Sequence, residues 1–141
     1  MMRRTVTFGG SNEMMAFSVG PAEVFEGRTI YPGSVDIWSL GILMCALYKK
    51  KLAVGYGECK MMPPWTKRSR IRVLCIKQFL EILTKDESKE LESFQEKYPG
   101  YAVVAFTISE VRHQKLLALI RRCFQKDSPT AGELLRDRFF H

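Results

Sequence analysis

The strongest limit on how this chain folds is set by residues 37–48, where apolar side chains fall on every face of a helix. A helix that is apolar all round lies in a protein core or in a membrane. This run is too short, and too interrupted by Ser39 and Gly41, to span a bilayer. The sequence therefore predicts a central core helix, with Ser34 as its N-cap residue and Asp36 near the positive end of its dipole.

Length and charge restrict the class of protein. With 141 residues, the chain is sized for one domain that buries roughly two-thirds of its unfolded surface. A hydrophobic fraction of 46% and a charged fraction of 26% are ordinary for a globular protein. The net charge of +7 predicts attraction to acidic surfaces, phosphates or nucleic acid, without choosing among them.

Cysteine and histidine positions predict neither a zinc site nor a disulfide framework. No C-x-x-C pair occurs, and the histidines are His113, expected on the surface of a helix, and the terminal His141. Cys45 and Cys75 lie in apolar helical context and are predicted to be small core residues. Because no segment has the pattern of a secretory signal or a transmembrane span, we expect an intracellular protein of the cytoplasm or nucleus, without a membrane partner.

Glycine and proline divide the chain into a lead-in, residues 1–33, and a helical domain, residues 34–141. Their density in the lead-in excludes a long helix there. Residues 101–108 are ambiguous, and we favour a packed loop over a strand because a lone strand has no partner. The expected fold class is mainly α. Beyond the central helix, apolar spacing and capping residues predict helices over Ile71–Leu83, from Asp86 toward Tyr98, over Ser109–Lys126, and from a capping box at Thr130–Glu133.

Residues 36–41, D-I-W-S-L-G, resemble the D-x-W-S-x-G motif that opens the central helix in the C-terminal lobe of serine/threonine protein kinases. Further matches follow in the order of that family. Residues 20–25, G-P-A-E-V-F, are similar to the A-P-E that closes a kinase activation segment, with Glu23 on the expected place. Residues 116–140 are similar to the C-terminal end of the kinase lobe, including P-T-A-G-E-L-L and a final F-F.

Residues 79–84, F-L-E-I-L-T, with Tyr98-Pro99 beyond them, look like the F-E-I-L-G-T-P segment and insert of one kinase branch. That branch contains the cyclin-dependent, mitogen-activated and glycogen-synthase kinases. Together the matches cover residues 20–141. The resemblance implies a helical kinase C-lobe without the nucleotide-binding N-lobe.

Catalytic motifs of the family do not occur in this sequence. Phosphoryl transfer needs a glycine-rich loop, a strand lysine paired with a helix glutamate, the H-R-D loop and the metal-binding D-F-G. Residues 7–9, T-F-G, match only the last two letters of D-F-G, and Thr7 cannot replace a carboxylate on magnesium. ATP and magnesium are implied for the intact family. For this chain we predict no catalytic, cofactor-binding or metal-binding residues.

Glu23 lacks its expected partner. In the family this glutamate pairs with an arginine, whose place here is Ser128. A buried carboxylate without a partner is costly. We expect Glu23 to be solvated, to pair with Arg121 or Arg122, or to be loosely held.

The central helix carries the other family positions. Asp36 resembles the residue that holds the catalytic-loop backbone in kinases; with that loop absent, a helix-start charge is the favoured interpretation. Trp38 and Gly41 complete the motif. Leu43 and Leu47 align with supports of the hydrophobic spine beneath adenine, and we expect them in the core.

A basic segment with one aromatic residue precedes the second predicted helix. Trp65, Lys67, Arg68, Arg70 and Arg72 are expected to form a loop that can meet phosphates or bases through charge and stacking. The favoured interpretation is a solvated loop that leads into the next helix and binds no ligand. Because the neighbouring region is often a docking surface in related kinases, a protein partner is preferred to nucleic acid.

The leading hypothesis is a truncated, pseudokinase-like homologue that is inactive alone. It either binds a protein partner, such as a kinase or kinase substrate, or is a fragment of a longer kinase. The alternative is a basic helical nucleic-acid-binding protein. Because kinases cover the catalytic face of the C-lobe, this chain is expected to leave apolar surface around its central helix uncovered and to self-associate.

Overall fold

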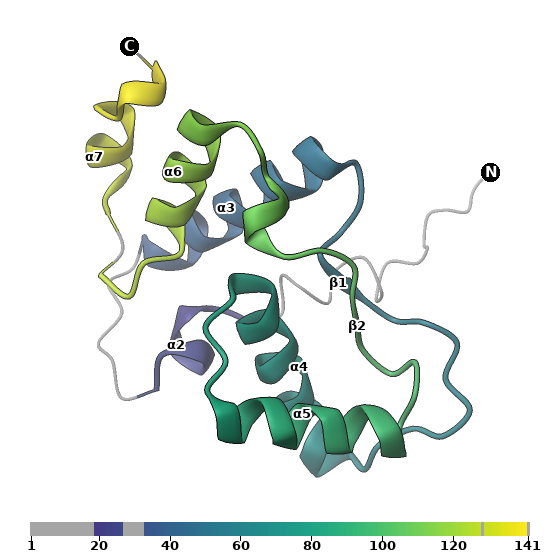
Figure 1. Cartoon of the computed structure of the whole chain (residues 1–141). Helices are drawn as coiled ribbons and strands as arrows, with labels where there is room; N and C mark the ends of the chain where they lie inside the picture. Colours follow the sequence, from purple (N-terminus) through teal and green to yellow (C-terminus); the bar gives the residue numbers. More distant parts are fainter. Residues whose placement is uncertain (1–18, 27–32, 128, 141) are drawn as a thin grey trace, which may run out of the picture.

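The computed structural model describes residues 19–26, 33–127 and 129–140 (Figure 1), and within them the chain is mainly helical, as predicted. Two strands, β1 (Val54–Gly55) and β2 (Val103–Val104), and two 3-10 turns, η3 (Ile108–Glu110) and η4 (Arg138–Phe140), accompany the helices. The helices are α2 (Pro21–Val24), α3 (Ser34–Lys49), α4 (Trp65–Leu80), α5 (Lys85–Lys97), α6 (Gln114–Cys123) and α7 (Ala131–Leu135).

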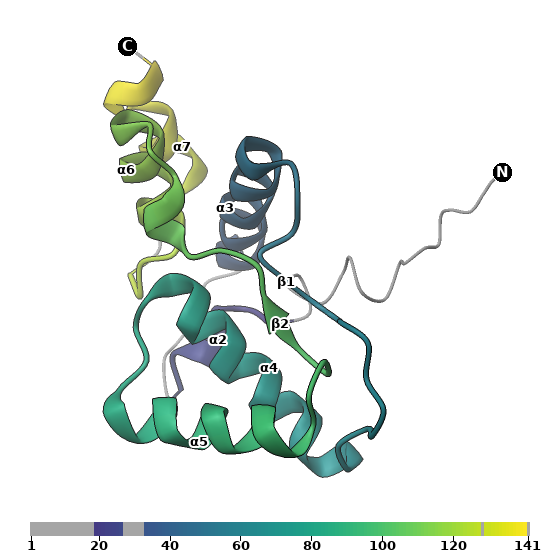
Figure 2. The same ribbon diagram turned by 45° about the vertical axis from the view of Figure 1, so that its right-hand side comes forward.

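The helices form two groups that share a main hydrophobic core, and a second, smaller cluster lies among α3, α6 and α7. Figures 1 and 2 show α3, α6 and α7 together in one group and α4 with α5 in the other. Helix α2 contacts both α3 and α4, so residues 19–26, assigned from the sequence to the lead-in, pack between the groups. Within the described residues, no helix is both long enough and apolar enough to cross a membrane.

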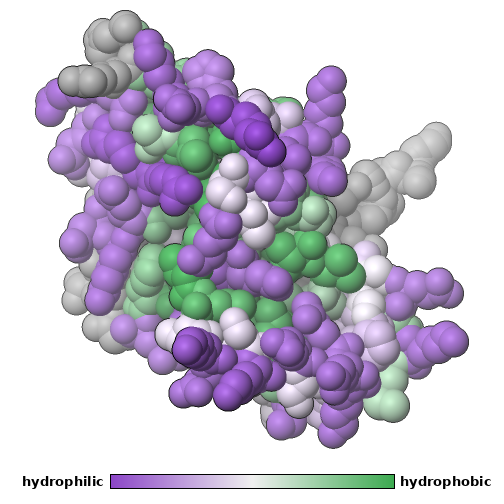
Figure 3. Space-filling view, viewed as in Figure 1, coloured by the Kyte–Doolittle hydropathy of each residue, from purple (hydrophilic) through white to green (hydrophobic). Residues whose placement is uncertain are grey.

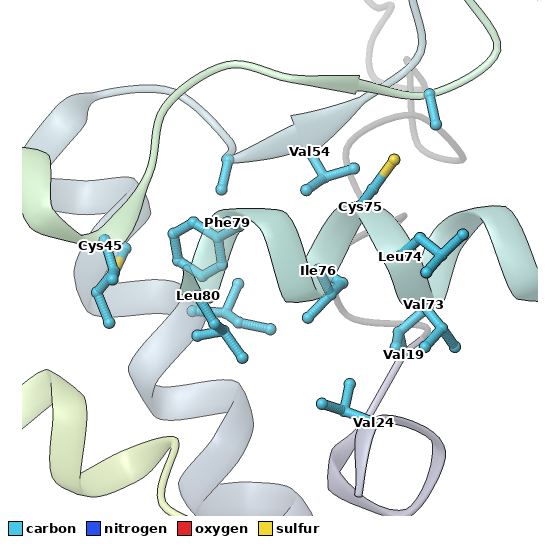
Figure 4. Close-up of a cluster of buried hydrophobic side chains, with 14 of the residues drawn as sticks. Val19, Val24, Cys45, Val54, Val73, Leu74, Cys75, Ile76, Phe79 and Leu80 are labelled. Carbon is cyan, nitrogen blue, oxygen red and sulfur yellow. The ribbon is translucent and has the colours of Figure 1, made fainter. Parts of the chain in front are cut away.

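Helix α4 supplies much of the core. Its buried side chains lie on more than one side (Figure 4): Cys75 lies on the side of Val54 in β1, and Val73 lies beside Val19 and Val24. Each of these residues is less than about a tenth exposed. The predictions that Cys45 and Cys75 are core residues are confirmed. Helix α4 therefore lies between the strand pair and residues 19–24.

The prediction that α3 is buried on every face is wrong. Leu43 and Leu47, expected in the core, are 45% and 68% exposed. Within the described residues, α2 and α6 are the elements that pack closely against α3, and they cover one face only. Apolar periodicity shows which faces can be buried, but it does not show how many neighbours a helix has. The buried positions of α3 are Ser34, Ile37, Trp38, Gly41, Ile42 and Cys45.

Helix α4 begins at Trp65, six residues before the predicted Ile71, so residues 65–70 are helical and not a loop. Residues 66–70 are polar, so the apolar pattern that indicates a helix starts only at Ile71. The helix ends at Leu80, where Glu81 adopts a left-handed conformation with φ 63°.

Capping residues differ from prediction at two helix starts. Ser34 is the first residue of α3, and Gly33 occupies the N-cap. Thr84, not Asp86, caps α5 and forms a capping box with Glu87. The box between Thr130 and Glu133 that was predicted to open α7 is present.

The ambiguous residues 101–108 contain a strand, so the preference for a loop there was wrong. Val104 pairs with Val54, and Val103 with Gly55, in an antiparallel ladder. The partner strand lies in a distant part of the sequence, so local pattern did not reveal it. Gly100, at φ +85°, makes the turn before β2 possible, because a side chain is strained in this conformation and a Cβ there would collide with the Glu58 carbonyl oxygen.

Helix α6 is shorter than the predicted 109–126. Residues Ile108–Glu110 form η3, and His113 is the N-cap of α6: the Leu116 N–H donates to its Nδ1 at 3.1 Å. His113 is exposed, as expected, but it caps a helix instead of lying within one.

Candidate interaction surfaces

Trp38 joins three segments of the core. Its indole Nε1 donates a hydrogen bond to the Val19 carbonyl oxygen at 2.9 Å. Its ring meets Phe124 edge-on at 5.1 Å between centroids and Phe25 at 6.1 Å. With only 2% of its surface exposed, Trp38 fixes the N-terminal segment and α6 against α3.

Gly41 allows α3 and α6 to approach closely. A Cβ at this position would lie 2.8 Å from the Cys123 Cβ and 2.9 Å from the Phe124 ring. Real Cβ contacts are not that short, so a larger residue requires the helices to shift. The glycine of the motif is therefore required by packing.

Glu23 is solvated, which is one of the arrangements expected for it. It is exposed, and its carboxylate accepts a hydrogen bond from the Gly20 N–H at 2.6 Å. Of the other expected partners, Arg122 donates to Asp137 at 2.7 Å, and Arg121 lines a hollow of about 230 Å³. Ser128 and residues 7–9 lie outside the described residues.

Asp36 is exposed in the first turn of α3. That position is favourable for an acidic side chain because the unpaired N–H groups of the first turn carry partial positive charge. The favoured interpretation of Asp36 as a helix-start charge accounts for this placement.

An apolar stripe runs along the uncovered face of α3. It consists of Leu40, Leu43 and Leu47, which are all exposed and spaced at i, i+3 and i+7. This agrees with the expected uncovered surface around the central helix. Hydrophobic surface also appears elsewhere: Figure 3 shows it between α6 and the α4–α5 pair, within hydrophilic surroundings.

The predicted basic loop is instead the start of α4, and helical geometry divides its charges. On one side, Arg70 forms a two-point ion pair with Glu90 at 2.8 and 2.9 Å, and the Lys67 ammonium lies over the Phe94 ring at 5.9 Å. On another, Arg68 and Arg72 line a pocket. The five residues do not form one continuous basic surface.

The pocket beside α4 has a volume of about 300 Å³. Sequence reasoning missed its other walls, Tyr56 and Tyr101, because they come from outside α4. A sequence signal did exist: Trp65, Arg68 and Arg72 are spaced at i, i+3 and i+7, which places them on one face once the segment is recognised as helical.

Three buried cysteines are poorly suited to nucleophilic chemistry. Burial raises the pKa of the Cys45 and Cys75 thiols to about 12 and that of Cys123 to about 11. Because the thiolate is the reactive form, these thiols stay protonated and unreactive near neutral pH. Their role is packing.

No protein-family model, curated protein or solved structure matches the chain. The kinase resemblance therefore rests on the sequence motifs of residues 20–141.

Proposed function

We propose that this chain is a non-catalytic relative of the protein-kinase C-terminal lobe and that it acts by binding another protein. The observation that carries the proposal is the uncovered stripe of Leu40, Leu43 and Leu47 on α3, the helix that bears the kinase-like motif. In kinases this helix lies beneath the catalytic loop, and no H-R-D sequence occurs in this chain.

The packing of the motif residues supports the kinase-like assignment. Trp38 needs both a large ring and an N–H donor, since it packs on Phe124 and bonds to Val19. Gly41 needs to be small because Cys123 lies so close. Trp38 and Gly41 thus each have a packing role that does not depend on catalysis.

The family's phosphoryl transfer is not proposed for this chain. That reaction needs carboxylates to hold magnesium and a lysine to hold the nucleotide phosphates. The sequence contains neither H-R-D nor D-F-G nor the V-A-I-K strand. A binding role needs none of them.

The α3 stripe suits an apolar helix or strand of a partner. Side chains at i, i+3 and i+7 form a narrow seam of the kind that packs against another helix, and exposed apolar surface of this sort marks interaction sites. The partner is a protein, such as a kinase, a kinase substrate or a second copy of this chain.

Sedimentation velocity of a Leu43→Lys/Leu47→Lys variant tests this role. The unmodified protein is expected to self-associate with increasing concentration, and the double variant to sediment as a monomer. Leu135→Lys is the matched control, since Leu135 is 65% exposed and Leu47 is 68% exposed, but Leu135 lies on α7. A monodisperse monomer of the unmodified protein at high concentration, without detergent or partner, contradicts the interface.

A fragment of a longer kinase is the alternative use of the same fold. Sequencing transcripts through the region upstream of Met1 distinguishes a kinase fragment from a separate binding protein. In-frame codons for H-R-D and D-F-G would assign the chain to a catalytic protein, and the α3 stripe would then contact the rest of that protein.

A further inference from the structure

A second candidate site lies on the opposite group of helices from the α3 stripe. The first turns of α4 place Trp65, Arg68, Ser69 and Arg72 on one face, at i, i+3, i+4 and i+7. This face lines the pocket of about 300 Å³ described above, together with Tyr56 and Tyr101. Arg68 and Arg72 line the pocket from successive turns, whose positions are separated by about 6 Å of helix rise.

Arg72 has an unsatisfied hydrogen-bond donor. Its Nε is buried and has no hydrogen-bond partner within the described part of the chain. A buried donor without an acceptor is destabilising, and the half-buried side chain that carries it also lines the pocket. Arg68 is held differently: its Nε donates to the Pro63 carbonyl oxygen at 3.0 Å, which restricts the position of its guanidinium group.

The charge of the pocket is positive. None of the described residues that line it is acidic. The nearby Arg70 lies outside the lining, where Glu90 neutralises it. An anion in the pocket therefore meets Arg68 and Arg72 without a competing carboxylate in the wall.

Aromatic groups form the rest of the wall. Tyr101 is buried, and its ring centroid lies 5.4 Å from that of Tyr56. Burial, followed by the effect of Tyr56, raises the pKa of Tyr101 to about 12, so this phenol stays neutral and adds no negative charge near neutral pH. Trp65, 80% exposed, also lines the pocket and offers an indole face to a ligand.

We propose that this pocket binds a phosphomonoester whose alcohol is a flat ring. The planar forks of Arg68 and Arg72 match phosphate oxygens, and the neighbouring aromatic side chains match a ring by stacking or edge contact. Two sources share this chemistry: a phosphotyrosine side chain and a nucleoside monophosphate. Because the site is distinct from the α3 stripe, it stands or fails independently of the proposed function.

A nucleic-acid strand fits this arrangement less well. Binding a strand uses a groove of cations that tracks successive phosphates, with a steep dependence on salt. Here Lys67 and Arg70 interact with Phe94 and Glu90 on α5, which leaves one compact pair of arginines for one phosphate.

Calorimetric titration with phenyl phosphate, using the full chain, tests the proposal. We expect saturable millimolar or tighter binding that weakens at least about tenfold in Arg72→Gln and in Arg68→Gln, because each removes a charge-assisted hydrogen bond. Arg70→Gln is the matched control: it makes the same change on the same helix outside the pocket and is expected to leave affinity within about twofold.

A folding readout keeps the test decisive. Because the Arg72 Nε has no partner to lose, Arg72→Gln is expected to unfold at the same temperature as the unmodified protein, or higher, without ligand. Arg72→Lys keeps the positive charge but loses the planar guanidinium group, and this variant is expected to bind phenyl phosphate more weakly than the unmodified protein does.

Two further titrations, with a phosphotyrosine peptide and with a nucleoside monophosphate, distinguish the two candidate ligands. Whichever binds more tightly than phenyl phosphate is identified as the ligand class and supports the site. Three results overturn the proposal: no saturable binding of phenyl phosphate, binding unchanged by Arg72→Gln, or inorganic phosphate binding as tightly as phenyl phosphate. Oligonucleotide binding that falls steeply with salt and is lost in Lys67→Gln also overturns it and favours a nucleic-acid surface.

Discussion

At the scale of single residues, the two tryptophans show how different environments give one residue type different roles. Trp38 is 2% exposed and links α3 to Val19 and Phe124. Trp65 is 80% exposed at the start of α4. The burial difference predicts that they contribute very differently to stability.

Replacing Trp38 with alanine is expected to lower the free energy of unfolding by about 3 to 5 kcal/mol, because it leaves a large cavity and removes a buried hydrogen bond. Trp65→Ala is the control and is expected to change it by no more than about 0.5 kcal/mol. Urea denaturation of both variants measures the difference. A change below about 1 kcal/mol for Trp38→Ala would place Trp38 outside the core.

Two helical glycines provide a second comparison. A Cβ at Gly41 would lie 2.8 Å from the Cys123 Cβ, whereas a Cβ at Gly132 meets its nearest atom, the Thr130 Oγ1, at 3.9 Å. Overpacking costs typically about 1 to 3 kcal/mol, and alanine is favoured over glycine within helices by about 1 kcal/mol. Gly41→Ala is therefore expected to destabilise the protein and Gly132→Ala to be neutral or stabilising.

Thermal unfolding, followed by circular dichroism, measures which of the two glycine variants is less stable. Equal midpoints for Gly41→Ala and Gly132→Ala would show that α3 and α6 are not in close contact. The comparison is well controlled because both substitutions add the same methyl group.

At the scale of elements, α5 contacts the rest of the protein through its buried residue Leu91 and also through two ion pairs to α4. Lys77 donates to Glu87 at 2.5 Å, and Arg70 pairs with Glu90. Hydrogen bonds from Lys77 and from Arg70 lower the pKa of Glu87 and of Glu90, respectively. The contact between the two helices is therefore expected to depend on pH.

The sign follows from the lowered pKa values. A carboxyl group whose pKa is lower in the folded state stabilises the fold above its unfolded pKa, about 4.3 for glutamate, and this contribution is lost as pH falls through the folded pKa. Glu87→Gln removes the contribution and is expected to flatten the dependence of stability on pH at the acidic end.

Urea denaturation between neutral and acidic pH measures that dependence. Glu92→Gln is the control, because Glu92 is exposed on the same helix and its replacement is expected to leave the pH profile unchanged. If stability depends on acidic pH in the same way for Glu87→Gln and the unmodified protein, the ion pair between Lys77 and Glu87 is not the cause of that dependence.

At the scale of the whole molecule, the described residues form two helix groups joined through the main hydrophobic core, with an apolar stripe on α3 and a basic, aromatic pocket beside α4. We propose both as binding surfaces. We expect the purified chain, incubated with labelled ATP, magnesium and a basic protein substrate, to show only background incorporation of phosphate.

The control for that assay is repurification. Contaminating kinase activity is lost when the protein is purified further, whereas an intrinsic activity follows the protein. Incorporation that persists and is abolished by Thr7→Ala or Asp36→Ala would contradict a non-catalytic role.

Local sequence determined those features that depend on near neighbours in the chain. The central helix, the Thr130–Glu133 capping box and the burial of Cys45 and Cys75 all follow from side chains a few residues apart. The motif of residues 36–41 was likewise readable without a structure, although its family assignment remains a proposal.

Tertiary structure decided which surfaces are covered and which residues meet. The exposure of Leu43 and Leu47, the pairing of β1 with β2 and the pocket between Tyr101 and Arg72 depend on segments far apart in the sequence. Periodicity describes a single helix or strand, whereas burial is a property of two packed elements. The central helix could therefore be predicted from its own residues, but its uncovered face could be identified only from what packs around it.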